Sequence, residues 1–137
     1  EDNDGMYGIY EYVEYCGYQI ENLFTQTTDN LGLTYGFSLD DYMAEIDAGR
    51  AVLIHVEDHT MLGYGYDETN NSTIYLRDTW TSGTHTMTWG GSYSDLGMWG
   101  VTVVDLAPVP EPVTLVMLGC LGAGMFAARK VRRQKKD

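Results

Sequence analysis

A histidine and an aspartate lie where they could act together on one predicted hairpin. Residues 59–78 contain two strand-like stretches, 59–66 and 73–78, around a run of turn-forming residues. If Tyr66 pairs with Thr73 across that turn, Asp78 falls on the same face as His59 and one pair away from it. A carboxylate beside an imidazole fixes its tautomer and stabilises its protonated form. The hairpin therefore predicts the base and the orienting group of a nucleophilic triad.

The two cysteines are not expected to complete that triad. Cys16 falls at the end of a predicted helix, where the helix dipole disfavours a thiolate. We interpret it as a buried or half-buried core thiol. Cys120 lies in an apolar C-terminal run and is interpreted as a small residue of that run. Because the two thiols belong to different regions, no disulfide is expected between them.

A metal site is a competing interpretation of the same stretch. His55, Glu57 and His59 alternate along what reads as one strand and would share a face, with His85 as a fourth ligand. A single histidine on a strand is more often structural than metal-binding. We therefore interpret His55 and His85 as structural residues and predict no metal and no other cofactor.

Helices are expected before the strands. Apolar residues recur at helical spacing over 6–16, and Gly17 follows as a C-terminal stop. Ser38 begins a second helix, with Asp41 placed as in a capping box. The region 17–37 predicts no clear element. Further strands are expected at 51–56, 84–89 and 98–106. Helices followed by an antiparallel sheet make an α+β domain.

Two segments of this region resemble a known family. They read Asp-His-Thr-Met-Leu-Gly-Tyr-Gly-Tyr-Asp at 58–67 and Ile-Tyr-Leu-Arg-Asp-Thr-Trp at 74–80. The pattern resembles the second half of a papain-fold cysteine peptidase, and more narrowly the C39-like group. In that group a His opens a strand that runs into Gly-Tyr. An Asp or Asn then ends the next strand, just before a small residue and a Trp.

The resemblance runs from about residue 38 to 106, and it implies a papain-like, C39-like fold for the domain 1–106 and a role for each matching residue. His59 would be the general base, Asp78 its orienting partner, and Trp80 a shield that keeps water from the pair. The family's nucleophilic Cys starts a long helix, which Cys16 does not, and papain has Gly where this chain has Thr81. The chain begins with Glu1 and not Met. We therefore expect an N-terminally truncated domain whose nucleophile lies upstream.

The C-terminus carries a second resemblance. Pro110, Glu111 and Pro112 close a linker over 107–112, ahead of an uncharged apolar run at 113–128 and a basic tail at 129–137. Sixteen residues of helix span about 24 Å, somewhat short of a hydrocarbon core of about 30 Å, and the flanking Thr and long basic side chains can make up the difference. Basic residues stay on the cytoplasmic side, so the rest of the chain is expected outside. The three-part arrangement resembles the PEP-CTERM sorting signal.

That resemblance implies export, anchoring in the inner membrane and processing by an exosortase-type enzyme near the Pro-Glu-Pro motif. The expected location is the inner membrane first, with the globular part outside the cytoplasm, and the cell surface or matrix after sorting. Peptides or exopolysaccharide are the expected partners.

Charge narrows the range of functions. Residues 1–128 hold two basic and 19 acidic residues, a net charge of −17, whereas the last nine residues carry +5. Such an acidic body repels phosphate backbones, so nucleic-acid binding is not expected. Two interpretations stay open: a C39-like cysteine peptidase, and a non-catalytic surface or matrix protein that uses the same scaffold for binding.

Overall fold

The computed structural model describes residues 5–67 and 69–107, which fold as an α+β unit of two helices packed on a seven-stranded antiparallel sheet. The elements, in chain order, are α1 Gly5–Tyr15, β1 Ile20–Thr27, the short 3-10 helix η1 Asp29–Leu31, α2 Leu39–Asp47, β2 Val52–Val56, β3 His59–Asp67, β4 Asn70–Arg77, β5 His85–Thr88, β6 Ser92–Tyr93 and β7 Leu96–Leu106.

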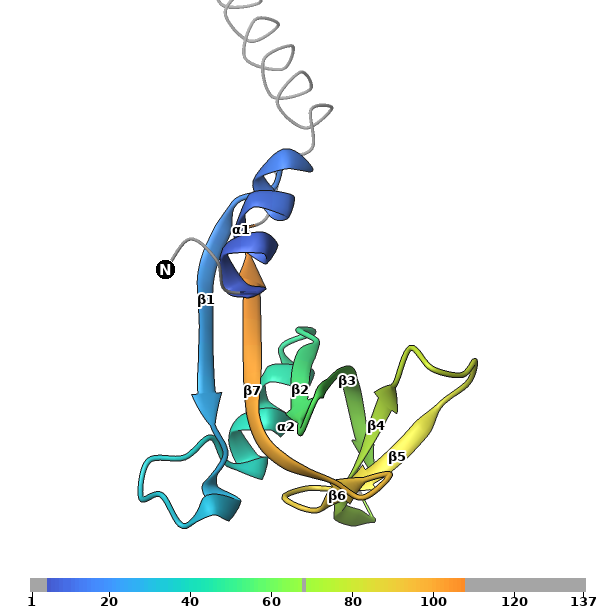
Figure 1. The fold of residues 1–137 in the computed structure, drawn as a ribbon. Coiled ribbons are helices and arrows are strands. Elements are labelled where there is room, and N and C mark those ends of the chain that lie inside the picture. Colours follow the sequence, from blue (N-terminus) through green and yellow to red (C-terminus); the bar gives the residue numbers. More distant parts are fainter. Residues whose placement is uncertain (1–4, 68, 108–137) are drawn as a thin grey trace, which may run out of the picture. The chain divides into compact units, whose positions relative to one another are not determined.

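The sheet is built from neighbouring hairpins and one long return. Its strand order is β1-β7-β2-β3-β4-β5, with β6 paired to β7 beside this path. The meander β2-β3-β4-β5 is local in sequence, because each strand pairs with the next. β7 then crosses back to lie between β1 and β2, and it runs side by side with β1 in Figure 1. Because β1 pairs with β7, the first strand of the domain lies beside the last one.

α2 begins at the residue that the sequence predicts. The Oγ of Ser38 accepts from the main-chain N–H of Asp41 at 3.1 Å, and the Asp41 carboxylate accepts from the main-chain N–H of Ser38 at 2.9 Å. This reciprocal pair is a capping box, which satisfies two otherwise unpaired donors at the helix start. The predicted N-terminus of the second helix is therefore confirmed.

α2 places Tyr42 over the inner face of the sheet. Tyr42 is fully buried, and its hydroxyl donates to the main-chain oxygen of Gly65 at 2.9 Å. Gly63 leaves room for the ring, because a Cβ on Gly63 would lie 2.9 Å from the Tyr42 hydroxyl. The buried apolar core on this side consists of Phe37, Tyr42, Val52, Ile54, Val56, Met61, Ile74, Leu76, Met87, Met98, Val101 and Val103.

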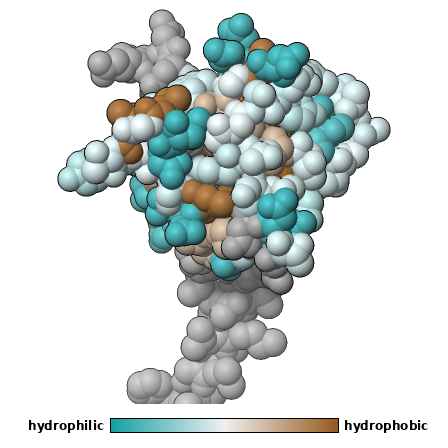
Figure 2. All heavy atoms as spheres, turned by 90° about the horizontal axis from the view of Figure 1, so that it is seen from below, coloured by the Kyte–Doolittle hydropathy of each residue, from teal (hydrophilic) through white to brown (hydrophobic). Residues whose placement is uncertain are grey.

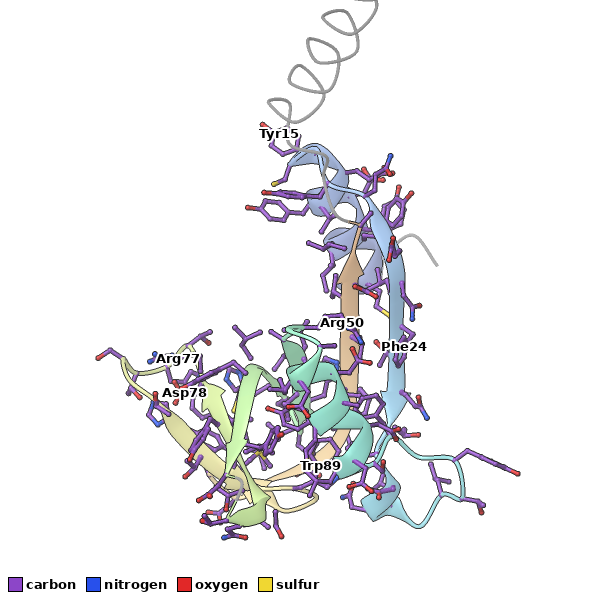
Figure 3. All side chains as sticks on the ribbon, turned by 180° about the vertical axis from the view of Figure 1, so that it is seen from behind. Tyr15, Phe24, Arg50, Arg77, Asp78 and Trp89 are labelled. Atoms are coloured by element: carbon purple, nitrogen blue, oxygen red, sulfur yellow. The ribbon has the colours of Figure 1, made fainter. Side chains whose placement is uncertain are left out.

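α1 packs against β1 and buries none of its side chains. Cys16, directly after this helix, is exposed. The expectation of a buried or half-buried core thiol is therefore wrong. Tyr15 lies at the end of α1 that leads into β1, far from Asp78 (Figure 3). Seen from below, the apolar surface forms small separate patches (Figure 2).

The predicted strands are present with adjusted bounds, and the hairpin register is confirmed at one end. Leu62 pairs with Arg77 and Gly63 with Leu76, as the predicted register requires. Beyond them the register shifts by one residue, so Tyr66 pairs with Ile74 and not with Thr73. The shift falls after the pairs nearest to His59 and therefore leaves the site end of the hairpin in the predicted register.

Within the described ranges, no helix is long and apolar enough to cross a membrane. The predicted Pro110-Glu111-Pro112 motif, the apolar run 113–128 and the basic tail 129–137 lie outside the described residues.

Candidate functional site

His59 is positioned by a tight turn and by the end of the neighbouring strand. It is the first residue of β3, directly after Asp58, whose φ of 57° closes the turn from β2. Its Nε2 lies 2.6 Å from the main-chain oxygen of Asp78. A carbonyl oxygen only accepts, so Nε2 must carry the proton and donate. The neutral ring is thereby held as the Nε2–H tautomer, and Nδ1 is left as the nitrogen that can take up a proton.

Trp80 covers one face of the His59 ring. The two rings stack with their centroids 4.1 Å apart and their planes 17° from parallel. The indole itself is 53% exposed. The indole therefore covers one face of the imidazole while remaining largely exposed itself.

The Asp78 carboxylate is almost completely buried and has its own set of partners. Its Oδ1 accepts from the main-chain N–H groups of Trp80 and Thr81, both at 3.1 Å, and its Oδ2 accepts from the Tyr93 hydroxyl at 2.7 Å. Thr79, with a φ of 65°, lies in the turn that directs these N–H groups toward the Asp78 carboxylate. Among the described residues, the Asp78 carboxylate makes no hydrogen bond to His59. The ring is bonded instead to the main-chain oxygen of Asp78.

These partners keep the carboxylate charged. Burial by itself raises the pKa of Asp78, but the hydrogen bonds from Tyr93 and Thr81, the nearby imidazole of His85 and the N–H of Trp80 bring the pKa of Asp78 below its usual value. Burial, together with the negative Asp78, raises the pKa of Tyr93 to about 12. At neutral pH the pair is therefore an ionised carboxylate and a neutral hydroxyl that donates to it.

A second histidine lies beside the same carboxylate. The Nε2 of His85 is 3.0 Å from the Thr81 hydroxyl and 3.5 Å from Oδ1 of Asp78. Its ring meets Tyr93 edge-on, with centroids 6.2 Å apart. His85 was interpreted as structural, and Thr81 and Tyr93 were not predicted for the site, because these residues come from separate loops and strands and follow no spacing rule.

The geometry does not support the metal interpretation. Glu57 and Asp58 form a turn between β2 and β3, so His55 and His59 lie on two different strands. Both ring nitrogens of His55 contact threonine hydroxyls. No cluster of three metal-binding side chains occurs within residues 5–67 and 69–107.

Cys16 is not brought to the site. It follows α1 and leads into β1, at one edge of the sheet, whereas Asp78 follows β4 near the other edge. Figure 3 shows the labelled neighbours Tyr15 and Asp78 far apart. An oriented and shielded imidazole can accept a proton and later return it, but covalent catalysis also needs a nucleophile within its reach.

The chain was compared with models of protein families, with curated proteins and with solved structures, and none of the three comparisons found a match. The chemistry of the site is therefore inferred from its own geometry.

Proposed function

We propose that residues 1–106 are the His/Asp half of a C39-like, papain-fold cysteine peptidase domain. The observation that supports this most is the arrangement around His59. Its Nε2 donates to the main-chain oxygen of Asp78, while Trp80 stacks on the ring. This arrangement leaves Nδ1 as the base. In this proposal the main-chain oxygen of Asp78, and not its carboxylate, orients the ring, while Trp80 covers one of its faces.

In this proposal the nucleophile is a cysteine from sequence preceding Glu1, next to the Nδ1 of His59. His59 takes the thiol proton, and the thiolate attacks the peptide carbonyl. The imidazolium then gives the proton to the leaving amine, and water hydrolyses the acyl-enzyme. The main-chain oxygen of Asp78, which accepts from Nε2, keeps the His59 ring oriented during these steps.

We further propose that the protein is exported and anchored by residues 113–128. An exosortase-type enzyme would process it at Pro110-Glu111-Pro112 and release it to the cell surface or the matrix. The proposal rests on the order of the motif, the apolar run and the basic tail. Export would place the acidic domain among extracellular peptides and polysaccharides.

A non-catalytic binding protein is the second candidate. Two observations favour it: Cys16 lies far from His59, and Trp80 is more than half exposed beside the histidine. An exposed indole offers a stacking surface to a peptide side chain or to a sugar ring. The same scaffold would then hold a peptide or exopolysaccharide without cleaving it.

The two candidates are separated by assaying the product of the complete gene. A mixture of unstructured peptides is incubated with the wild type, His59→Ala and the matched control Cys16→Ser, and the products are identified by mass spectrometry. The peptidase proposal expects cleavage that is lost in His59→Ala and retained in Cys16→Ser. Intact peptides with the wild type, together with retained peptide or polysaccharide binding, would overturn the peptidase and support the binding protein.

A further inference from the structure

A cavity of about 460 Å³ lies on the face of the sheet opposite α2, under α1. Met6 and Ile9 of α1, Leu53 of β2 and Trp99 of β7 supply its apolar walls. Pockets that hold small molecules commonly measure about 300–1,000 Å³. His59 and Asp78 take no part in its lining, so the cavity is separate from the proposed peptidase site.

The polar side of the cavity is a continuous hydrogen-bonded chain. The Oγ of Thr25 donates to the sulfur of Met6 at 2.8 Å and lies 2.5 Å from the Oγ of Thr102. The Thr102 hydroxyl is 2.7 Å from Nε2 of His55, and Nδ1 of His55 is 2.9 Å from the Thr60 hydroxyl. The chain thus links α1 to β1, β7, β2 and β3.

The direction of this chain follows from counting protons. Thr25 gives its only hydroxyl proton to Met6, so Thr102 must donate to Thr25. Thr102 has then used its proton, and Nε2 of His55 must donate to Thr102. A neutral ring leaves Nδ1 as an acceptor, so Thr60 donates to it. Burial lowers the pKa of His55, which agrees with a neutral ring.

The side-chain donors of the cavity are therefore already used. The indole N–H of Trp99 donates to the main-chain oxygen of Val56 at 3.1 Å. The oxygens of Thr25 and Thr60, both on exposed residues, keep lone pairs that can accept. A ligand is thus offered apolar walls and acceptors, but no free donor from these groups.

Charge sets a further limit on the ligand. None of the residues lining the cavity is Asp, Glu, Lys or Arg, and a charge buried there would lose water without gaining a counter-ion. The surrounding negative charge further disfavours anions.

We propose that this cavity binds an uncharged, mostly apolar ring compound that donates one hydrogen bond, as a phenol does. The ring packs between the α1 side chains and the sheet, and its hydroxyl donates to Thr25 or Thr60. The site is independent of peptidase activity.

Binding is tested by titrating phenol, and fluorobenzene as a ring of similar size without a donor, into the ¹⁵N-labelled protein. Saturable shifts are expected at the main-chain amides around Leu53 and Trp99. Leu53→Trp and Ile9→Trp, which fill the cavity from the sheet and from the helix, are each expected to abolish them. Leu33→Trp is the matched control, because Leu33 is an exposed leucine in the loop before α2 and takes no part in the lining, and it should bind as the wild type does.

The proposed hydrogen bond from the phenol hydroxyl to Thr25 or Thr60 is tested separately. In Thr25→Val or Thr60→Val, phenol affinity should fall about two- to tenfold while fluorobenzene affinity stays unchanged, which is the size expected for one lost hydrogen bond. No saturable binding, or phenol binding that survives both cavity-filling variants, would overturn the site. Equal effects on phenol and fluorobenzene would overturn the donor requirement. Because Ile9 lies on the exposed helix α1, its variant tests the site even if Leu53→Trp fails to fold.

Discussion

At the scale of single residues, the main chain and the side chain of Asp78 have different partners. The main-chain oxygen holds His59, while the carboxylate is bonded to Tyr93 and to the N–H groups of the following turn. The carboxylate thus fixes the turn that presents the carbonyl to His59, and it also places a negative charge nearby. An asparagine would keep an acceptor for the turn but would lose the charge.

Asp78→Asn should change how stability depends on pH. The folded-state pKa of Asp78 lies below its usual value of 3.8, so ionised Asp78 stabilises the fold above that value. This contribution is lost as the pH falls through 3.8 and then through the lower folded-state pKa. Urea unfolding from about pH 7 to 3 should show a lower free energy of unfolding for the variant at pH 7 and a flatter profile below pH 4. Identical profiles for wild type and variant would contradict the assignment.

His55 should give a second pH effect in a different range. Its folded-state pKa lies below 6.5 because burial penalises the charged ring, so the unfolded chain binds a proton that the folded chain does not. The free energy of unfolding should therefore fall as the pH drops from 6.5 through the folded-state pKa. In His55→Gln this slope should disappear when unfolding is followed between about pH 7 and 5. His85→Gln is the comparison, and a slope that follows His85 instead would contradict the prediction.

At the scale of elements, β3 is shaped by the helix that packs on it. Gly63 lets Tyr42 of α2 approach the strand closely enough for its hydroxyl to bond the main chain of Gly65, and Gly65 itself leaves room for the side chain of Tyr75. Desolvation of the phenol raises the pKa of Tyr42 to about 12, so the hydroxyl stays a donor. The small residues of this strand are thus explained by packing, whatever the function.

Gly63→Ala should destabilise the domain by about 1–3 kcal/mol, as overpacking of a core does. The new methyl group would lie 2.9 Å from the Tyr42 hydroxyl and 3.1 Å from a carbon of Ile54, so one of them must move. Gly97→Ala is the matched control in a strand, because its Cβ would meet nothing closer than 4.0 Å. Urea unfolding of the two variants checks the difference, and equal stabilities would disprove the close approach.

Sequence patterns predicted the elements that are local and missed those that depend on distant partners. The capping box at Ser38 and the hairpin from His59 depend on neighbouring residues, and both were predictable. β1 was missed, since Ile20–Thr27 has no clean alternation and pairs with β7 far along the chain. The turn at Glu57 was missed because the residues around it alternate as in one strand, and this produced the metal interpretation.

The residues of the candidate site also divide into those that the sequence predicts and those that depend on distant partners. His59, Asp78 and Trp80 were predictable from one hairpin and the residues after it. Tyr93 and His85 were not, because β5 and β6 carry them back to Asp78 only after the sheet has formed.

At the scale of the whole molecule, the charge pattern agrees with the proposed export. Two basic and 19 acidic residues precede the tail, and the tail holds six basic residues in its nine positions. In the proposal the apolar run between them is the anchor and the tail orients it.

A truncation that ends at Ala107 should be found in the soluble periplasmic or extracellular fraction, whereas the complete chain should sediment with membranes. The reason is that the shorter chain lacks the apolar run 113–128. Fractionation with immunoblotting measures this. In the control, the six basic residues of the tail are replaced by Gln, which should keep membrane attachment but weaken the fixed orientation. Equal sedimentation of the truncated and complete chains would contradict the proposed anchor.

The central claim is that the main-chain oxygen of Asp78 holds the neutral His59 ring in the Nε2–H tautomer, which leaves Nδ1 able to accept a proton. The ¹⁵N shifts of the His59 ring, recorded at a pH where the ring is neutral, test this most directly because they distinguish the two tautomers. The account predicts the Nε2–H form, with Nδ1 unprotonated, since Nε2 donates to the Asp78 carbonyl at 2.6 Å. A ring protonated at Nδ1, or one that exchanges equally between both forms, would contradict it.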